Sequence, residues 1–368
     1  MPDWTAADWI DPRRPWTNPL PVPEYPERLL VDFATRCNLR CPMCPVWGSD
    51  DERAIDEVTG IMDVEGARRL LDEVMAAAPM VAPSVYGEPL LIPDLREILA
   101  AIKQRGLPIA MNTNGLTLTD ALARFFVDQR VDSVMFSLDA VTKETLQKVR
   151  GIDRLEKIES NVFRLMRVRG DAEYPRVGVS FTIQPENAHE LDAFVARWIG
   201  VVDVVRTCPV FDTQAGTFTQ VDAPADRRPC PAIYKTMAIH NDGTVRLCCL
   251  DGFRATDMGN VFGDGIKAVW RGEAFAKARY AHETGQWDRV PFCQPCNGWV
   301  QYDYDEEIRD GILIRRSPQF TYYNTIDRLQ NWRGRLLGGH TPPPADLSAR
   351  ASRPDGRSAP RTPPAGDR

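Results

Sequence analysis

Short apolar runs alternate with amphipathic segments along residues 28–212. Six runs have the length and composition of buried strands, at 28–34, 80–86, 108–112, 133–137, 176–183 and 201–208. Five intervening segments place apolar residues at helical spacing, at 65–77, 93–106, 119–129, 154–168 and 187–199. The alternation predicts an α/β fold built from consecutive strand–helix units.

Consecutive βαβ units favour right-handed crossovers and therefore a parallel sheet. Six units are fewer than the eight of a closed TIM-type barrel, so we predict a partial (βα)6 barrel over residues 28–212. In such folds the binding site lies at the carboxyl ends of the strands. Functional residues are therefore expected directly after each strand.

The regular alternation stops after Cys208. Asn241, Asp242 and Gly243 separate two short apolar runs and predict a β-hairpin within a second, smaller unit. Beyond residue 338 the chain is rich in Pro, Arg, Ser and Gly, and such a composition predicts disorder. The expected organisation is an N-terminal extension (1–27), the barrel (28–212), a linker (213–226), an auxiliary domain (227–300), a helical or packing segment (301–338) and a disordered tail (339–368).

Composition and charge narrow the classes of partner. The formal net charge of -6 argues against nucleic acid, because binding phosphates needs a clustered excess of Lys and Arg. The sequence has no apolar run long enough for a membrane span, and acidic residues stand where a signal peptide would begin with basic ones. We therefore expect a cytoplasmic protein with no membrane partner.

Cys37, Cys41 and Cys44 form a CxxxCxxC pattern directly after the first predicted strand. Thiols so close together in a reducing compartment favour metal or cluster ligation over disulfides. Two alternatives are a zinc site and a ferredoxin-like cluster, each with a fourth ligand elsewhere in the chain. A third is that the thiols simply pack as small apolar groups.

Three further motifs follow successive strands: YGEP at 86–89, MNTNG at 111–115 and SLDA at 137–140. Together with the CxxxCxxC loop, their order resembles that of the radical S-adenosylmethionine (SAM) superfamily. The resemblance implies that Cys37, Cys41 and Cys44 bind three irons of a [4Fe-4S] cluster, while the amine and carboxylate of SAM chelate the fourth. It also implies a 5′-deoxyadenosyl radical that removes a hydrogen atom from substrate, and an electron donor such as flavodoxin or ferredoxin.

The same resemblance supplies candidate contacts to SAM. These are Met43, Gly87, Glu88, Pro89, Asn112, Asn114, Ser137, Asp139, Ser180 and Thr182.

Simpler interpretations compete for most of these residues. Glu88 is alternatively a solvated loop carboxylate, and Met43 is alternatively a packing residue. Asn112 and Asn114 are also typical turn residues. Ser137 and Asp139 can instead cap the helix that follows them. Ser180 and Thr182 share one face of the fifth strand, but the pattern alone leaves open which way that face points.

A second set of cysteines comprises Cys230, Cys248, Cys293 and Cys296. It resembles the SPASM/twitch extension of some radical SAM enzymes. Because no cysteine follows Cys296, the resemblance implies the shorter twitch form, with one auxiliary [4Fe-4S] cluster and two clusters in all. A zinc site is the alternative, and Cys249 competes with Cys248 as a ligand.

Cys208, at the end of the sixth predicted strand, is the candidate catalytic residue. It is either a buried small apolar residue or a thiol that returns a hydrogen atom to a substrate radical. The second role predicts epimerisation of a carbohydrate-like small molecule, since twitch-bearing relatives act on aminoglycoside sugars and aminocyclitols. Dehydrogenation of a secondary alcohol to a ketone, with the auxiliary cluster as electron acceptor, is the first alternative. Modification of a ribosomal peptide is the second, and a non-catalytic cluster-binding sensor is the third.

Overall fold

The computed structural model describes residues 22–210, 227–251, 256–291, 293–294, 296–302 and 304–326. All six predicted strands are present as β1 (Arg28–Val31), β4 (Met80–Ala82), β5 (Ala110–Thr113), β6 (Ser133–Ser137), β7 (Arg176–Ile183) and β8 (Val204–Pro209). The five predicted helices are α2 (Val64–Val74), α3 (Leu95–Gln104), α4 (Asp120–Asp128), α6 (Leu155–Arg169) and α7 (Leu191–Trp198). The hydrophobic periodicity therefore predicted the barrel elements correctly.

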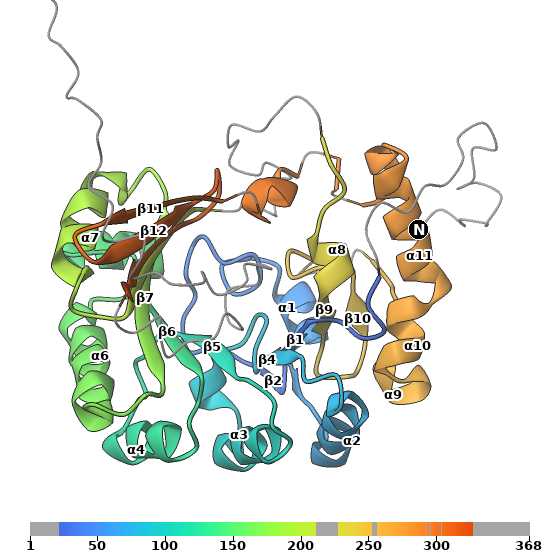
Figure 1. Cartoon of the computed structure of the whole chain (residues 1–368), viewed down its shortest axis with the longest axis horizontal. Coiled ribbons are helices and arrows are strands. Elements are labelled where there is room, and N and C mark those ends of the chain that lie inside the picture. Colours follow the sequence, from blue (N-terminus) through green and yellow to red (C-terminus); the bar gives the residue numbers. More distant parts are fainter. Residues whose placement is uncertain are drawn as a thin grey trace, which may run out of the picture.

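The strands form an open, curved arrangement with the helices on its outer side (Figure 1). β1 pairs with β4 in parallel, and β5 to β8 pair in parallel in sequence order. A single bridge between Val81 and Ile109 joins the two sets. The predicted partial barrel is confirmed, and its concave side is the place for a site.

Alternation along each strand separates the two sides of the barrel wall. On β7, Val179 and Phe181 belong to the main hydrophobic core, and Phe181 lies 4.8 Å from Phe194 of α7 between ring centroids. Because side chains alternate along a strand, Ser180 and Thr182 face the opposite, concave side.

Shorter elements lie in the connections between the barrel strands and helices. They are β2 (Ala34–Thr35), α1 (Glu52–Val58), β3 (Gly60–Ile61), η2 (Pro89–Leu91), α5 (Lys143–Arg150) and η3 (Ala188–Glu190). α5 begins at Thr142, whose side chain accepts a hydrogen bond from the Thr145 N–H. The helix cap expected from Ser137 or Asp139 is therefore provided by Thr142 instead.

The predicted hairpin is present as β9 (Thr236–Ile239) and β10 (Val245–Arg246), which pair antiparallel. β9 also pairs in parallel with β1, so the auxiliary unit shares the barrel's sheet. All four β9 residues are buried, which suits a strand covered on both faces. The unit also contains α8 (Ala232–Lys235), α9 (Val261–Asp264), α10 (Ile266–Arg271), α11 (Glu273–Glu283), η4 (Trp287–Arg289) and η5 (Gly298–Tyr302).

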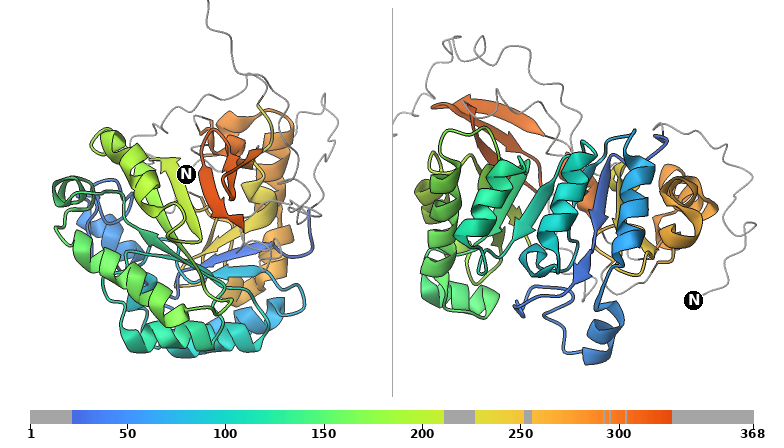
Figure 2. Two further views of the ribbon diagram at one scale, coloured as in Figure 1. Left: turned by 60° about the vertical axis from the view of Figure 1, so that its left-hand side comes forward. Right: turned by 90° about the horizontal axis from the view of Figure 1, so that it is seen from below.

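Seen from below, these helices continue the row of barrel helices beyond α2 (Figure 2). The α2 residue Glu73 links α2 to α10, because its carboxylate accepts the N–H groups of Ile266 and Lys267, both at 2.8 Å. Gly265 allows this approach, since an added Cβ would lie 3.1 Å from the Glu73 carboxylate.

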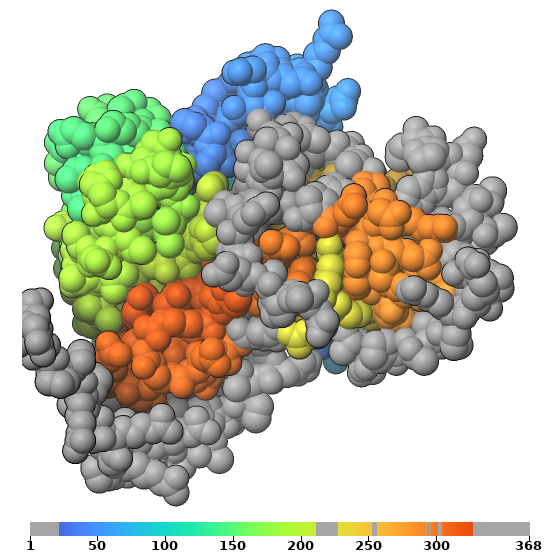
Figure 3. All heavy atoms as spheres, turned by 90° about the horizontal axis from the view of Figure 1, so that it is seen from above, coloured from blue at the N-terminus to red at the C-terminus, as the bar shows by residue number. Residues whose placement is uncertain are grey.

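Most of the described part of the segment predicted as helical or packing (301–338) is strand. Residues 305–325 form an antiparallel meander of β11 (Asp305–Arg309), β12 (Ile312–Arg316) and β13 (Thr321–Thr325), and β13 pairs with β8. The turn at Asp310 and Gly311, both with positive φ, is the hairpin signal that the sequence interpretation overlooked. From above, this meander lies beside the last barrel units, opposite the helices of the auxiliary unit (Figure 3).

Three predicted segments lie outside the described residues: most of the N-terminal extension, the linker at 213–226 and the tail at 339–368. None of the helices in the described part of the chain is long and apolar enough to cross a membrane.

We predict that Glu73→Ala weakens the attachment of α10 to α2. Losing a carboxylate that caps a helix costs about 1 to 2 kcal/mol, which should lower Tm by about 1 to 4 °C. The measurement is a calorimetric melt of the cluster-loaded protein. Glu57→Ala, which removes an exposed carboxylate from α1, should leave Tm unchanged, and an equal shift in both variants would contradict the prediction.

Candidate functional site

The three-cysteine loop follows β2 and lies at the barrel mouth. The N–H of Leu39 donates to Cys37 Sγ at 3.4 Å, and the N–H of Trp47 donates to Cys44 Sγ at 3.3 Å. The Cys44 N–H bonds to the Cys41 carbonyl at 2.9 Å, which folds the loop into a tight turn. Backbone donors to thiolate sulfur are typical surroundings of iron–sulfur ligands.

Gly48 closes this loop. Its N–H bonds to the Cys44 carbonyl at 3.1 Å. An added Cβ would lie 2.4 Å from the Cys41 carbonyl oxygen, 2.7 Å from that of Cys44 and 2.8 Å from that of Pro42. Only glycine can occupy this position without displacing the cysteine backbone.

The chemistry of the donors fits a cluster. Burial raises the pKa of Cys37 to about 12, and burial also raises the pKa of Cys41, so ligation must displace protons from both. In the described residues, no three Cys, His, Asp or Glu side chains close around a single metal-ion position. The evidence that this loop suits an iron–sulfur cluster is therefore the three adjacent thiols and the backbone N–H groups that donate to them.

A buried carboxylate holds the YGEP loop beside the cysteine loop. Asp32 Oδ1 accepts the N–H groups of Val85 at 2.7 Å, Tyr86 at 3.1 Å and Gly87 at 3.4 Å. Burial raises the pKa of Asp32 to about 6, although these donors oppose the shift. Gly87 packs so closely that an added Cβ would lie 2.3 Å from the Ala34 carbonyl oxygen.

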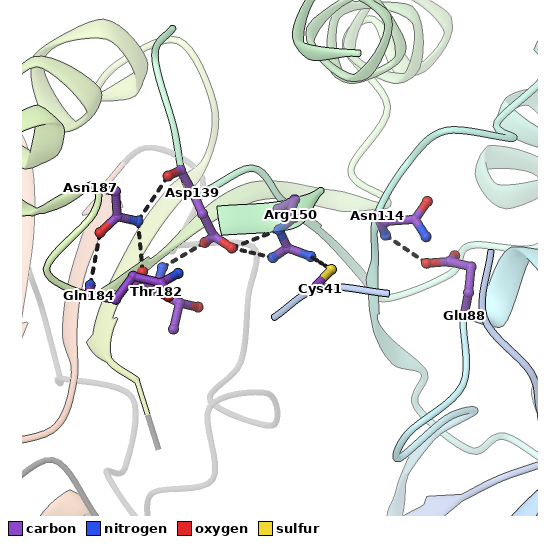
Figure 4. Close-up of polar contacts among 8 residues, drawn as sticks. All are labelled: Cys41, Glu88, Asn114, Asp139, Arg150, Thr182, Gln184 and Asn187. Atoms are coloured by element: carbon purple, nitrogen blue, oxygen red, sulfur yellow. Dashed lines mark hydrogen bonds and ion pairs between the residues drawn. The ribbon is translucent and has the colours of Figure 1, made fainter. Parts of the chain in front are cut away.

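Glu88 is buried and joins the YGEP loop to the end of β5. Its carboxylate accepts the Thr113 hydroxyl at 2.5 Å and the Leu90 N–H at 3.0 Å. It also accepts the Asn114 N–H at 2.7 Å (Figure 4). The interpretation as a solvated loop carboxylate is wrong. Both carboxylate oxygens already have protein donors, so the geometry gives Glu88 the role of bracing the YGEP loop against β5. Pro89 follows Glu88 as the first residue of η2.

The MNTNG motif contains both a turn and a link to the cysteine loop. The Asn114 side chain accepts the Leu116 N–H at 3.1 Å, which is a typical Asx turn. Its amide also donates to Asn38 Oδ1 at 2.8 Å, within the cysteine loop. Asn112 is exposed on β5, in register with Met135.

Asp139 connects the SLDA motif to the three-cysteine loop. It is fully buried and adopts a left-handed backbone conformation, with φ of 64°. Its carboxylate accepts the Thr182 N–H at 2.6 Å and pairs with Arg150, whose Nε lies at 2.8 Å (Figure 4). Arg150 Nη1 in turn lies 3.9 Å from Cys41 Sγ, so a buried cation adjoins a predicted iron ligand.

The concave wall gathers several predicted residues in register. Ser137 pairs with Ser180, and Thr182 pairs with Cys208 on the neighbouring strand. Cys208 is only 8% exposed. Burial raises its pKa, although the charge of Arg206 acts in the opposite direction, so the group is a thiol near neutral pH. Met43 is half-buried in the cysteine loop.

The auxiliary cysteines also come together. The thiols of Cys230, Cys248, Cys293 and Cys296 lie close enough to perturb one another, and Cys249 adjoins the same group. Burial is the main cause of the raised pKa of each of the four.

Polar groups support this second set. The Cys230 N–H donates to His282 Nδ1 and the Gly298 N–H donates to Cys296 Sγ, both at 3.2 Å. Arg227 donates to the carbonyls of Cys293 and Gln294, and its guanidinium stacks 4.5 Å from the Trp287 ring centroid. The set resembles the first in having N–H donors to sulfur.

Sequence reasoning missed the residues that brace the site. Asp32 was hidden in an apolar run, and a charged residue within a buried strand was its available signal. Arg150, Arg227 and His282 gave no local signal, because their partners are 11 or more residues away in the chain.

Residues 31–197 match the model of the Radical SAM superfamily, and residues 230–297 match that of the SPASM iron–sulfur cluster-binding domain. The chain therefore contains a Radical SAM superfamily domain and, C-terminal to it, a SPASM domain. The first domain implies SAM and a [4Fe-4S] cluster, and the second implies additional iron–sulfur clusters.

A curated relative from Pyrococcus furiosus, the tungsten-containing aldehyde ferredoxin oxidoreductase cofactor-modifying protein, is 30% identical over 181 residues. The match covers 46% of this chain and 47% of the relative, and the chain spans roughly half the length of the curated relatives that it matches.

Two solved structures are similar to this chain, and the first of them supports the fold. Native anSMEcpe with bound AdoMet (SAM) has a TM-score of 0.55 at 13% identity, over 74% of this chain and 90% of that one. BtrN in complex with AdoMet and 2-DOIA has a TM-score of 0.48 at 19% identity, over 74% of this chain and 92% of that one.

We predict that Gly48→Ala prevents assembly at the first cysteine set, because the new Cβ displaces the carbonyls of Cys41 and Cys44. Iron bound after anaerobic reconstitution should fall by about four per chain, the content of one cubane. Gly263→Ala is the matched control, since an added Cβ there meets nothing within 4 Å. Full iron content in Gly48→Ala would show that the loop tolerates the side chain.

Proposed function

We propose that this radical SAM enzyme epimerises a carbon of a carbohydrate-like small molecule, with Cys208 as the hydrogen-atom donor. One observation carries the proposal. Cys208 lies in register with Thr182, whose N–H bonds to Asp139, and Asp139 pairs with the Arg150 that adjoins Cys41. A chain of direct contacts therefore links the thiol to the loop predicted to hold the cluster.

The residues of the mouth suit binding and orientation. Ser137, Ser180 and Thr182 supply hydroxyl groups on the concave wall, which favours a substrate with several hydroxyls. We propose that SAM binds beside the YGEP loop, where Asp32 and Glu88 brace the backbone. The residues proposed to line its site are Met43, Gly87, Glu88, Pro89, Asn112, Asn114, Ser137, Asp139, Ser180 and Thr182. The bracing geometry of Glu88 and Asp139 favours an indirect part for their carboxylates.

When bound, the reduced cluster and SAM supply a 5′-deoxyadenosyl radical that removes a hydrogen atom from a substrate carbon. Cys208 then gives its thiol hydrogen to that carbon from the opposite face, which inverts the centre. The thiol form is the one required, and burial of Cys208 favours it. One electron and one proton restore the thiol, and a flavodoxin- or ferredoxin-like donor would supply the electron. Cys230, Cys248, Cys293 and Cys296 would hold the auxiliary cluster, which would supply a redox centre for this electron.

Dehydrogenation is the second candidate. It is favoured by the four auxiliary thiols, because a closed cluster can accept the electron released when a base deprotonates the hydroxyl of the substrate radical. We propose a single auxiliary [4Fe-4S] cluster on Cys230, Cys248, Cys293 and Cys296.

The test is anaerobic turnover in deuterated water with SAM, reductant and a panel of aminoglycosides and aminocyclitols. Because the Cys208 thiol exchanges with solvent, an epimeric product should contain one added deuteron. Cys208→Ala should still form 5′-deoxyadenosine but should lose the epimer. A product lighter by two hydrogens would overturn epimerisation in favour of dehydrogenation.

Val201→Ala is the control, since that residue is exposed and lies outside both cysteine sets and the concave wall. It should retain the deuterated epimer. An epimer formed equally well by Cys208→Ala would remove that thiol from the mechanism.

A further inference from the structure

Tyr86 contacts both halves of the molecule. Its hydroxyl donates to the Cys249 carbonyl at 2.7 Å, and its ring stacks on His240 with centroids 5.6 Å apart. Its backbone carbonyl accepts the Trp47 indole N–H at 2.7 Å, and its N–H donates to Asp32. One residue of the YGEP loop therefore joins the cysteine loop, the end of β1 and the auxiliary unit.

Both ends of this connection adjoin predicted cluster ligands. The Trp47 backbone N–H donates to Cys44 Sγ, and the Cys249 carbonyl follows Cys248 directly in the chain. A change in the backbone at Cys248 and Cys249 therefore reaches the YGEP backbone through a single hydrogen bond.

The auxiliary unit has other attachments, so the Tyr86 contact is not needed to hold it in place. Asn241 donates to the Thr35 hydroxyl at 2.7 Å and to the Val58 carbonyl at 2.8 Å. β9 also pairs with β1, and Glu73 holds α10. Removing the Tyr86 hydroxyl should therefore leave the fold intact and alter only the position of the YGEP loop.

We propose that Tyr86 is a positioning residue that couples SAM binding at the first site to occupancy of the auxiliary site. Ligation at Cys248 fixes the neighbouring Cys249 carbonyl, which holds the Tyr86 hydroxyl and with it the loop of residues 84–87. SAM then binds a loop that is already ordered, so its binding free energy does not include the cost of ordering that loop. Coupling of this kind is reciprocal, so bound SAM also stabilises the auxiliary site.

This inference rests on SAM binding at the first site, as in the proposed function. The experiment measures the Kd of SAM by anaerobic equilibrium dialysis for cluster-loaded wild type, Tyr86→Phe, Cys293→Ala/Cys296→Ala and the triple variant. Losing one hydrogen bond should weaken SAM binding by about 2- to 10-fold. The cysteine pair should have a similar effect, and the triple variant should bind no more weakly than the pair.

Tyr174→Phe is the matched control, because Tyr174 precedes β7 and stacks on Arg130, away from the auxiliary unit. Its Kd should equal that of wild type. A second readout, hydrogen exchange of the 84–88 peptide, should be faster in cluster-loaded Tyr86→Phe than in wild type, and this remains measurable if the cysteine variants fold poorly.

Wild-type Kd and wild-type exchange in Tyr86→Phe would overturn the coupling, as would additive losses in the triple variant. Failure of wild type itself to bind SAM would instead contradict the proposed function. The perturbation of the reduced-cluster electron paramagnetic resonance signal by SAM separates these two outcomes.

Discussion

The buried carboxylate of Asp32, at the end of β1, holds the candidate site together. It gathers three consecutive N–H groups of the YGEP loop, while its own backbone N–H donates to the Ile239 carbonyl on β9. A carboxylate without such donors would be costly to bury, and its raised pKa shows that part of this cost remains. Asp32 thus fixes the YGEP loop, which lies beside the cysteine loop, relative to the auxiliary hairpin.

Other buried charged residues connect further loops at the barrel mouth. Glu88 ties the YGEP loop to β5, and the pair of Asp139 and Arg150 ties β6 and β7 to Cys41. Breaking a buried pair of this kind leaves an uncompensated charge, which is much costlier than losing a surface pair. The loops that would hold SAM and substrate are therefore braced by groups that have little freedom to move.

The barrel elements were predictable because buried strands and amphipathic helices leave a local period in the sequence. Pairing between distant segments leaves no such period in the sequence. The pairing of β9 with β1 and that of β13 with β8 were therefore not predicted. The cysteines and the loop motifs were likewise predictable from residue type and spacing. Residue type does not reveal which way a side chain points: Glu88 could have been a solvated loop carboxylate, yet it is buried and its oxygens accept protein donors.

The two cysteine sets differ in the number of thiols they offer. The four thiols of the second set, Cys230, Cys248, Cys293 and Cys296, would be enough to close a cubane. The three thiols of Cys37, Cys41 and Cys44 would leave one iron for another ligand. The most direct test is electron–nuclear double resonance of the reduced protein with SAM labelled with ¹⁵N at its amine. An open iron that binds SAM predicts a ¹⁵N hyperfine coupling to a cluster, and this coupling should be lost in Cys41→Ala. A spectrum without that coupling, in protein shown to bind SAM, would contradict the open iron site.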